Sequence, residues 1–488
     1  MVSADITCQQ GTSTGETKAP PTEVPGVSII IVTWNKEKDV ARLLEQLRHI
    51  DYPEDKVEIT VVDNDSTDDT VDIIELTYPW VRLIKNAENL GGAGGFNTGM
   101  RWVLENRPEC EYMWLLDNDV LVDRSALAEL VGVMENNPGA GICGSKILNI
   151  ANHIEVIEVG GLIDYRIGDT KSNIPRRAQL NDKDAVFSVD YVAACSLLVR
   201  TELVTELGML KENLFIYWDD MEWGMRFNAA GHRVLASNAS VVYHPIWPKS
   251  TGDNSAIWRS YYRARNSLWF FNNYTPRITR QLLLARIVIN SVALALSRCM
   301  SCDSRNSQSI IRGIKDFLHG MYGRKDIEIP VHDLDHYLSN RIVKGFCVFI
   351  RHVAFHEKAI HFISGLMRRF PQTKIVSIVP DETCFEWINL AGKNNVMAYK
   401  SPGKHPLSWT DKLRILKFLW KKPWDLLVTS PLSNWTVGIW GKDVARVDFE
   451  KEIVLSIEKM KTMTLFSIPY MAISFIFRVL LFPPAPEK

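Results

Sequence analysis

Residues 27–35 read VSIIIVTWN, and this stretch decides the class of fold. From Ser28 to Val32 the run is almost wholly apolar and β-branched, which is typical of a strand buried on both faces of a parallel sheet. The pattern recurs downstream, with strands expected at 57–62, 81–85 and 112–116 and helices near 40–47, 70–77 and 99–105. Strands that alternate with helices in this way predict an α/β domain on a mostly parallel sheet with right-handed crossovers.

The C-terminal part of the chain shows a second alternation, with no sequence repeat between the two halves. Short strands are expected at 346–350, 374–379, 396–399 and 426–429, and helices near 357–370, 382–392 and 409–421. We therefore predict a first domain over residues 26–325 and a second, smaller α/β domain over residues 341–460. Residues 1–25 are polar and rich in Thr, Gly and Pro, which predicts a disordered leader.

Composition excludes several classes of function. The 488 residues carry 56 Lys and Arg against 57 Asp and Glu, so the chain lacks the basic footprint of a general nucleic-acid binder. Its 8 cysteines are too sparse for a disulfide scaffold, and the CxxC of Cys299 and Cys302 lacks the partners of a zinc site. The N-terminus shows no basic segment followed by an apolar one, so we expect no secretory signal and a cytoplasmic location.

Two carboxylates follow a buried strand in YMWLLDNDV, residues 112–120. Asp117 and Asp119, on either side of Asn118, are spaced so that both can face one divalent cation, and hard cations prefer oxygen ligands. A cation there would neutralise charge that develops on a diphosphate leaving group. An Asp-rich turn without a ligand is the alternative.

The segment NLGGAGGFNTG, residues 89–99, would let the backbone approach a ligand closely. It is not a Walker loop, because no Lys-Ser or Lys-Thr follows it. It also departs from the dinucleotide fingerprint, since Asn97 stands where that motif needs glycine. A flexible turn is the alternative.

Two further stretches carry reactive side chains. FIYWDDMEWGMR, residues 215–226, sets three acids among aromatic residues at the start of an expected helix. A carboxylate in that setting can serve as general base to a sugar hydroxyl, although acids also stabilise the first turn of any helix. His244 ends the apolar part of VVYHP, where a structural role is the alternative to a ligand role.

Seven stretches, taken in order, resemble the family-2 glycosyltransferases of the GT-A fold over about residues 26–325. They are VSIIIVTWN, VVDNDSTDDT, NLGGAGGFNTGM, LLDNDV, FIYWDDMEWGMR, VVYHP and YYRARN. The glycine-rich segment, the Trp-Asp-Asp run and the spacing from Asp220 to His244 are most similar to bacterial galactofuranosyltransferases. Related rhamnosyltransferases share much of this pattern.

The resemblance implies roles for individual side chains at the donor site. The implied donor residues are Thr33 and Asp63 at the base, Gly92, Asp117, Asn118 and Trp218 lining the pocket, and Arg263 and Arg265 at the phosphates. The implied ligands of Mn²⁺ or Mg²⁺ are Asp117, Asp119 and His244. For the two arginines, an ordinary surface position is an equal alternative.

Catalysis is assigned by the same resemblance to Asp220, which matches the base that deprotonates the acceptor hydroxyl during inverting attack on the anomeric carbon. Two positions depart from the family pattern. Asp65 stands where the family usually has Gly, and Asp219 stands where Glu is common. The second departure leaves open which of Asp219 and Asp220 takes the proton, and we favour Asp220.

The implied function is a metal-dependent inverting glycosyltransferase that moves galactofuranose from UDP-galactofuranose to a lipid-linked glycan in cell-surface polysaccharide synthesis. A rhamnosyltransferase that uses dTDP-rhamnose and an inactive GT-A scaffold protein are the alternatives. The expected partners are the nucleotide sugar, the glycan acceptor, the membrane surface and either other glycan-assembly enzymes or further copies of the chain, without nucleic acid.

Three stretches bear on membrane association. Residues 463–482 are apolar and long enough to span a bilayer, but a proline and an arginine interrupt them. We therefore expect residues 461–488 to be a tail that lies in the cytoplasmic leaflet, with the protein peripheral to the inner face of the membrane. Residues 282–296 favour a packed or membrane-facing helix over a span, and the basic-aromatic residues 412–424 suit either an interfacial or a solvated helix.

Overall fold

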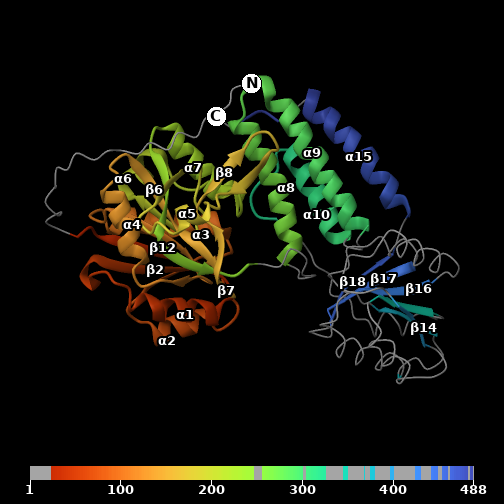
Figure 1. The fold of residues 1–488 in the computed structure, drawn as a ribbon, viewed down its shortest axis with the longest axis horizontal. Coiled ribbons are helices and arrows are strands. Elements are labelled where there is room, and N and C mark those ends of the chain that lie inside the picture. The colour runs from red at the N-terminus through yellow and green to blue at the C-terminus, as the bar shows by residue number, and fades with distance from the viewer. Residues whose placement is uncertain are drawn as a thin grey trace.

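The computed structural model describes most of the chain (Figure 1). The described residues are 24–246, 255–300, 304–325, 345–349, 368, 374–379, 396–400, 424–429, 441–448, 453–459, 462–481 and 484–486. The leader expected at 1–25 therefore lies outside them apart from its last two residues. The helices expected at 357–370, 382–392 and 409–421 lie outside them as well, except for Arg368, which is helical.

The larger of the two main sheets has ten strands in the order β10-β12-β6-β11-β4-β1-β2-β3, with β5 beside β12 and β7 beside β6. The strands are β1 (Val27–Thr33), β2 (Val57–Asp63), β3 (Arg82–Lys85), β4 (Tyr112–Asp117), β5 (Leu121–Val122), β6 (Ala140–Asn149), β7 (Asn152–Glu158), β10 (Val186–Val189), β11 (Ser196–Arg200) and β12 (Arg233–His244). A separate hairpin pairs β8 (Gly161–Asp164) with β9 (Asp169–Ser172). The predicted α/β class is confirmed.

Strand direction in this sheet departs from the prediction. Strands β1 to β4 are mutually parallel, and so are β6 and β12. Strands β5, β7, β10 and β11, in contrast, pair antiparallel with their neighbours. The expectation of a mostly parallel sheet is therefore wrong beyond β4. Only Ile150 and Ala151 separate β6 from β7, and so short a link closes a hairpin, because a parallel crossover needs about a dozen residues.

Both faces of the larger sheet are covered, which explains the unbroken apolar run in β1. Ile29 and Ile31 point to one face, where they share a core with Leu43, and Ile30 points to the other, where it packs with Phe96. The helices around the sheet are α1 (Glu37–Leu47), α2 (Thr70–Thr77), α3 (Gly91–Asn106), α4 (Ala126–Glu135), α5 (Arg177–Leu180), α6 (Thr201–Leu207) and α7 (Asp219–Ala229).

The glycine-rich segment is helical, which corrects both the expected start of this helix near residue 99 and the flexible-turn alternative. Helix α3 begins at Gly91, and its glycines lie against the sheet. A Cβ on Gly95 would lie 2.5 Å from Val32 Cγ1, and one on Gly99 would lie 2.4 Å from Ile30 Cγ2. The absence of side chains therefore lets α3 approach β1 and β2 closely.

We expect Gly99→Ala to lower the free energy of unfolding by about 1–3 kcal/mol, because the new methyl group overpacks the contact with Ile30. Gly132→Ala in α4 is the matched control, since a Cβ there meets nothing within 4 Å. It should stabilise the protein by about 0.5–1 kcal/mol through helix propensity alone. Urea unfolding measures both variants, and equal effects would contradict the close approach of α3.

Four long helices form a second body beside the larger sheet (Figure 1). They are α8 (Ser255–Tyr274), α9 (Arg277–Met300), α10 (Ser304–Leu318) and α15 (Thr462–Leu481). Phe475 and Val479 of α15 are buried in the same cluster as Leu284 and Val288 of α9. Among the described residues, one stretch, Arg277–Arg298 of α9, is long and apolar enough to cross a membrane, and 39% of its apolar window is buried.

The smaller sheet has six strands in the order β15-β14-β13-β16-β17-β18. They are β13 (Gly345–Phe349), β14 (Lys374–Val379), β15 (Val396–Lys400), β16 (Trp424–Thr429), β17 (Gly441–Asp448) and β18 (Ile453–Lys459). All neighbours are parallel except β17 and β18. The four expected strands are confirmed, whereas β17 and β18 were not expected. The proposed domain boundaries stay predictions.

Candidate active site

Several predicted site residues meet at one edge of the larger sheet. Thr33 ends β1, Asp63 ends β2 and Asp117 ends β4. In the register of these parallel strands Thr33 is level with Asp63, and Val32 is level with Asp117. The carboxyl edge of an open α/β sheet is where ligands bind, so the fold itself brings these side chains into one site.

A cluster of three possible metal ligands lies at this edge. One ligand atom each from Asp117, Asp119 and His244 lies within 4.8 Å of the others. His244 Nε2 is 3.5 Å from Asp119 Oδ1 and 3.8 Å from Asp117 Oδ2. The other ring nitrogen, Nδ1, is 2.8 Å from the carbonyl oxygen of Pro245. Only a protonated Nδ1 can bond to that carbonyl, so Nε2 is the ring nitrogen that faces the two carboxylates.

The donor set of this cluster fits a divalent cation. Two carboxylate oxygens and an imidazole nitrogen suit Mn²⁺, and the oxygens also suit Mg²⁺. The pKa of Asp117 is raised to about 6 by burial and by the like charges of Asp119 and Asp220, with His244 opposing the rise. Because the Asp117 side chain is 43% exposed, water limits the effect of burial, and the repulsion by like charges is the larger cause of the raised pKa. A bound cation would relieve that repulsion.

Two adjacent carboxylates stand at the start of α7. Asp220 accepts a hydrogen bond from the Met221 N–H at 2.9 Å and a longer one from the Ala194 N–H at 3.4 Å. Burial raises the pKa of Asp220 to about 6, and these N–H groups oppose the rise. Burial also raises the pKa of Asp219 to about 8, to which the charge of Asp220 adds. Asp219 therefore keeps its proton to higher pH than Asp220, and Asp220 is the acid of the pair that ionises first.

The loop that leads into α7 is strained. Phe215, Tyr217 and Trp218 have φ values of 69°, 63° and 72°, in the left-handed region that non-glycine residues rarely adopt. Asn266 of α8 compensates for this strain, because its Nδ2 donates to the carbonyl oxygens of Leu214, Ile216 and Tyr217, each at 2.9 Å. The loop conformation that sets the direction of Asp219 and Asp220 is thus fixed from α8.

We expect Asn266→Ala to lower the free energy of unfolding by about 1–3 kcal/mol, because the partly buried carbonyl groups of Ile216 and Tyr217 lose the Asn266 amide as partner. It should also lower kcat more than it changes the KM for donor, because the α7 carboxylates lose their fixed orientation. Asn106→Ala is the control, since Asn106 Nδ2 donates to a single helix carbonyl at an exposed site. Chemical unfolding and steady-state kinetics report the two effects, and a change in stability alone would contradict a role in the site.

Two of the predicted donor residues, Arg265 and Trp218, are buried by packing against the long helices. Arg265 is 1% exposed, and its guanidinium donates to the carbonyl oxygens of Gly323 at 2.8 Å and Leu214 at 3.0 Å. Arg265 therefore acts on the site only through the loop whose carbonyl group it binds. This corrects the expectation that Arg265 contacts phosphate or lies at the surface. Trp218 is 2% exposed and packs on Phe270, so its bulk lies in the helical core. Arg263 is exposed and pairs with Asp169 at 3.1 Å.

Asp63, which was predicted to bind the nucleotide base, keeps free hydrogen-bonding capacity. Asp63 is 2% exposed, and its Oδ2 accepts the Ser66 N–H at 3.0 Å, whereas its Oδ1 is buried without a partner. An unpaired buried acceptor is costly, so a ligand N–H at Oδ1 would be stabilising. Asn118 Nδ2 donates to Thr33 Oγ1 at 3.0 Å, which ties the DND turn to β1. Asp65 has a φ of 64°, which explains why glycine suits this position.

Gly92, predicted to line the donor pocket, lies close to Asp219 of α7. A Cβ there would lie 3.9 Å from Ile216 Cγ1 and 4.0 Å from Asp219 Oδ2.

The sequence did not point to Glu158, a buried acid at the end of β7. Burial raises its pKa to about 7, Ser172 Oγ opposes the rise by donating at 3.1 Å, and the charge of Asp220 adds to it. Its position inside the apolar run VIEVGG was the available signal.

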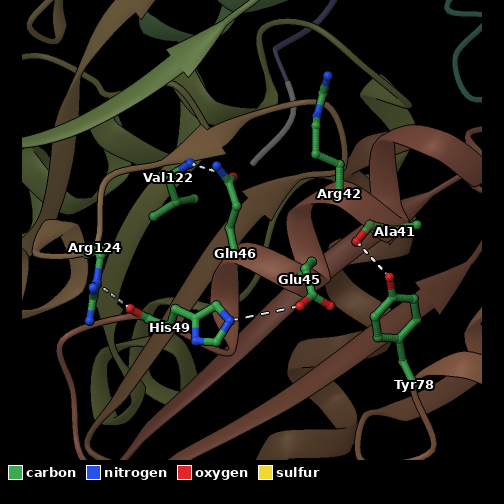
Figure 2. Close-up of a pocket in the computed structure, with 8 residues that line it drawn as sticks. All are labelled: Ala41, Arg42, Glu45, Gln46, His49, Tyr78, Val122 and Arg124. Atoms are coloured by element: carbon green, nitrogen blue, oxygen red, sulfur yellow. Dashed lines mark hydrogen bonds and ion pairs between the residues drawn. The ribbon is translucent and has the colours of Figure 1, made fainter.

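A hollow elsewhere on the surface is not part of this site. Figure 2 shows it along α1, with a volume of about 520 Å³. Its polar groups are already engaged: Gln46 Oε1 accepts the Val122 N–H at 3.1 Å, and Arg124 Nε donates to the His49 carbonyl at 2.8 Å. None of its lining residues belongs to the acidic cluster.

Two carboxylates and a histidine thus gather at the carboxyl edge of an α/β sheet, where such sheets bind ligands, and they form a candidate metal site. Residues 28–157 match the family model described as Glycosyl transferase family 2, so the chain carries a glycosyltransferase domain of that family. This match confirms the predicted family over residues 28–157, and the predicted enzyme class agrees with it.

The individual relatives have low sequence identity to this chain. The chain is 23% identical over 276 residues to galactofuranosyltransferase GlfT2 of Mycolicibacterium smegmatis, a match that covers 51% of this chain and 41% of that protein. The chain thus spans about two-fifths of that relative. It is 28% identical over 257 residues to dTDP-rhamnosyl transferase RfbF of Shigella flexneri, covering 51% of this chain and 80% of RfbF. A solved mannosyltransferase from Pyrobaculum calidifontis, in complex with GDP-Man and Mn²⁺, is similar at a TM-score of 0.40 and 20% identity over 61% of this chain and 88% of that one.

Proposed function

We propose that this protein is a metal-dependent inverting glycosyltransferase that transfers galactofuranose from UDP-galactofuranose to a lipid-linked glycan at the inner face of the cell membrane. The observation that carries the proposal is the pairing of two groups at one sheet edge. Asp117, Asp119 and His244 form a cation site. Asp220 is an oriented carboxylate close enough to raise the pKa of Asp117.

Each side chain has a task in the proposed reaction. Asp63 accepts an N–H of the nucleotide base at its free Oδ1. Asp117, Asp119 and His244 would hold Mn²⁺ or Mg²⁺, and such a cation supplies charge neutralisation for the diphosphate leaving group. Asp220 accepts the proton of the acceptor hydroxyl as that oxygen attacks the anomeric carbon from the face opposite the leaving group, so the configuration inverts.

Rhamnose from dTDP-rhamnose is the second candidate donor. It is favoured by coverage, because the match to RfbF spans 80% of that relative, whereas the match to GlfT2 spans 41%. A third relative, described as an N-acetylglucosaminyl-diphospho-decaprenol L-rhamnosyltransferase of Mycobacterium tuberculosis, is covered over 78% of its length. Galactofuranose remains our first choice because of the glycine-rich and Trp-Asp-Asp stretches.

The test is a donor panel. The full chain is incubated with Mn²⁺, a lipid-linked glycan and each of several nucleotide sugars, and nucleotide release and product mass are measured. We expect UDP release from UDP-galactofuranose that depends on both cation and acceptor. Turnover of dTDP-rhamnose alone would select the second candidate. Absence of turnover with every donor would favour an inactive scaffold and overturn the enzymatic proposal.

A further inference from the structure

Charge is distributed very unevenly in the four long helices. Together α8, α9, α10 and α15 contain eleven arginines and lysines but a single acid, Asp316. Asp316 is 6% exposed and accepts the Tyr261 hydroxyl at 2.7 Å. The chain as a whole has a net charge of −1, so this body concentrates positive charge that the rest of the protein balances.

Apolar side chains are exposed on two of these helices. On α9, Ile278 is 92% exposed and Leu282 70% exposed. On α15, Ile473 is 64% exposed and Phe477 63% exposed. Figure 1 shows α15 lying alongside α9 at the outer side of the helical body, and Phe475 and Val479 of α15 anchor it there in the shared core. Both helices thus expose apolar side chains while their buried faces pack in the same core.

We propose that α9 and α15 together form the surface by which the protein lies on a bilayer that contains anionic lipid. The exposed apolar side chains would enter the acyl boundary, and basic residues beside them, such as the exposed Arg286, would meet lipid phosphates. The lack of exposed acid on any of the four helices is the charge complementarity that an anionic surface requires. A second copy of this basic surface would be repelled instead.

This inference deepens the proposed function, since it rests on a lipid-borne acceptor, but it concerns a surface different from the sheet edge that holds the acids. The same packing concerns the C-terminal tail, which the sequence predicted over residues 461–488. Residues 462–481 are packed on α9 as one of two helices, so deletion of the tail would expose the core of the helical body. Point substitutions on exposed positions are therefore the sharper test.

The experiment is flotation of the full chain with vesicles, either of phosphatidylcholine alone or of phosphatidylcholine mixed with phosphatidylglycerol. We expect binding to the mixed vesicles that weakens as salt is raised. The double variant Leu282→Asp, Phe477→Asp should lose at least about tenfold in partitioning. Arg286→Glu should lose at least roughly fivefold on the mixed vesicles and little on the neutral ones.

Leu76→Asp is the matched control, because Leu76 is 83% exposed on α2, far from these helices in sequence, and its partitioning should equal that of the parent chain. Thermal unfolding confirms that each variant is folded. Equal binding by all variants, or equal binding to neutral and anionic vesicles, would overturn the proposal. So would a dimer without vesicles that dissociates in the Leu282→Asp, Phe477→Asp variant. Failure of the donor panel would leave vesicle binding intact, so the two proposals fail separately.

Discussion

Asp220→Asn is expected to lower kcat by about 10²–10⁴-fold while the KM for the donor changes little. The amide keeps the shape of the carboxylate and can still accept the N–H bond from Met221, but it cannot accept the proton of the acceptor hydroxyl. The loss therefore falls on the chemical step rather than on binding. Steady-state kinetics at saturating acceptor, with donor varied, separates the two quantities.

Asp219→Asn is the matched control for this prediction. With its pKa raised to about 8, Asp219 is protonated at neutral pH, and an amide is the closest neutral mimic of a protonated carboxyl. We expect this variant to keep kcat within roughly threefold at pH 7, because the hydrogen-bonding shape is kept and no charge is lost. If Asp219→Asn were inactive and Asp220→Asn active, the roles of the two acids would be exchanged.

The pH profile follows from the same pair. A base must be ionised to act, and the pKa of Asp220 is raised to about 6, so kcat should rise as the pH passes upward through about 6. The Asp219→Asn variant should show the same limb, since Asp219 stays neutral across that range in the parent chain. Rates measured from acid to neutral pH at saturating Mn²⁺ test this, and a flat profile would contradict base catalysis by Asp220.

The features predicted best from the sequence are those that a local pattern of residues determines. The β-branched run of β1 requires burial on both faces, and Asp117 at the end of β4 had to lie beside the end of β1 once these strands were parallel. His244 lies far from Asp119 in sequence. It meets Asp119 because β12 runs beside β6 and pairs with β5, just beyond the DND turn, and only the resemblance to known enzymes anticipated that pairing.

The features that could not be predicted from the sequence depend on tertiary contacts. Glycine has low helix propensity, so local rules argued against a helix from residue 91, yet contact between Gly99 and Ile30 favours it. Arg265 carries the same charge whether it is buried or exposed, and its burial follows from the carbonyl groups of the loop before α7. Strand β17 carries charged residues at four of its eight positions, so it lacks the apolar run that identified its neighbours.

His244→Ala and Asp119→Asn are each expected to weaken Mn²⁺ binding by at least roughly tenfold, because even the loss of a residue that only hydrogen-bonds to a metal ligand costs that much. Each removes one of three ligand atoms that lie within 4.8 Å of one another. Asp123→Asn is the control: it is an exposed acid in the same stretch of chain, and it accepts hydrogen bonds from Ser125 instead of facing the cluster. Mn²⁺ titration followed by electron paramagnetic resonance measures the affinity without requiring turnover.

Removal of the metal by a chelator should abolish sugar transfer in the parent chain, and added Mn²⁺ should restore it. Parent-like Mn²⁺ affinity in both ligand variants would place the cation elsewhere, and full activity in excess chelator would show that Asp117, Asp119 and His244 act without one.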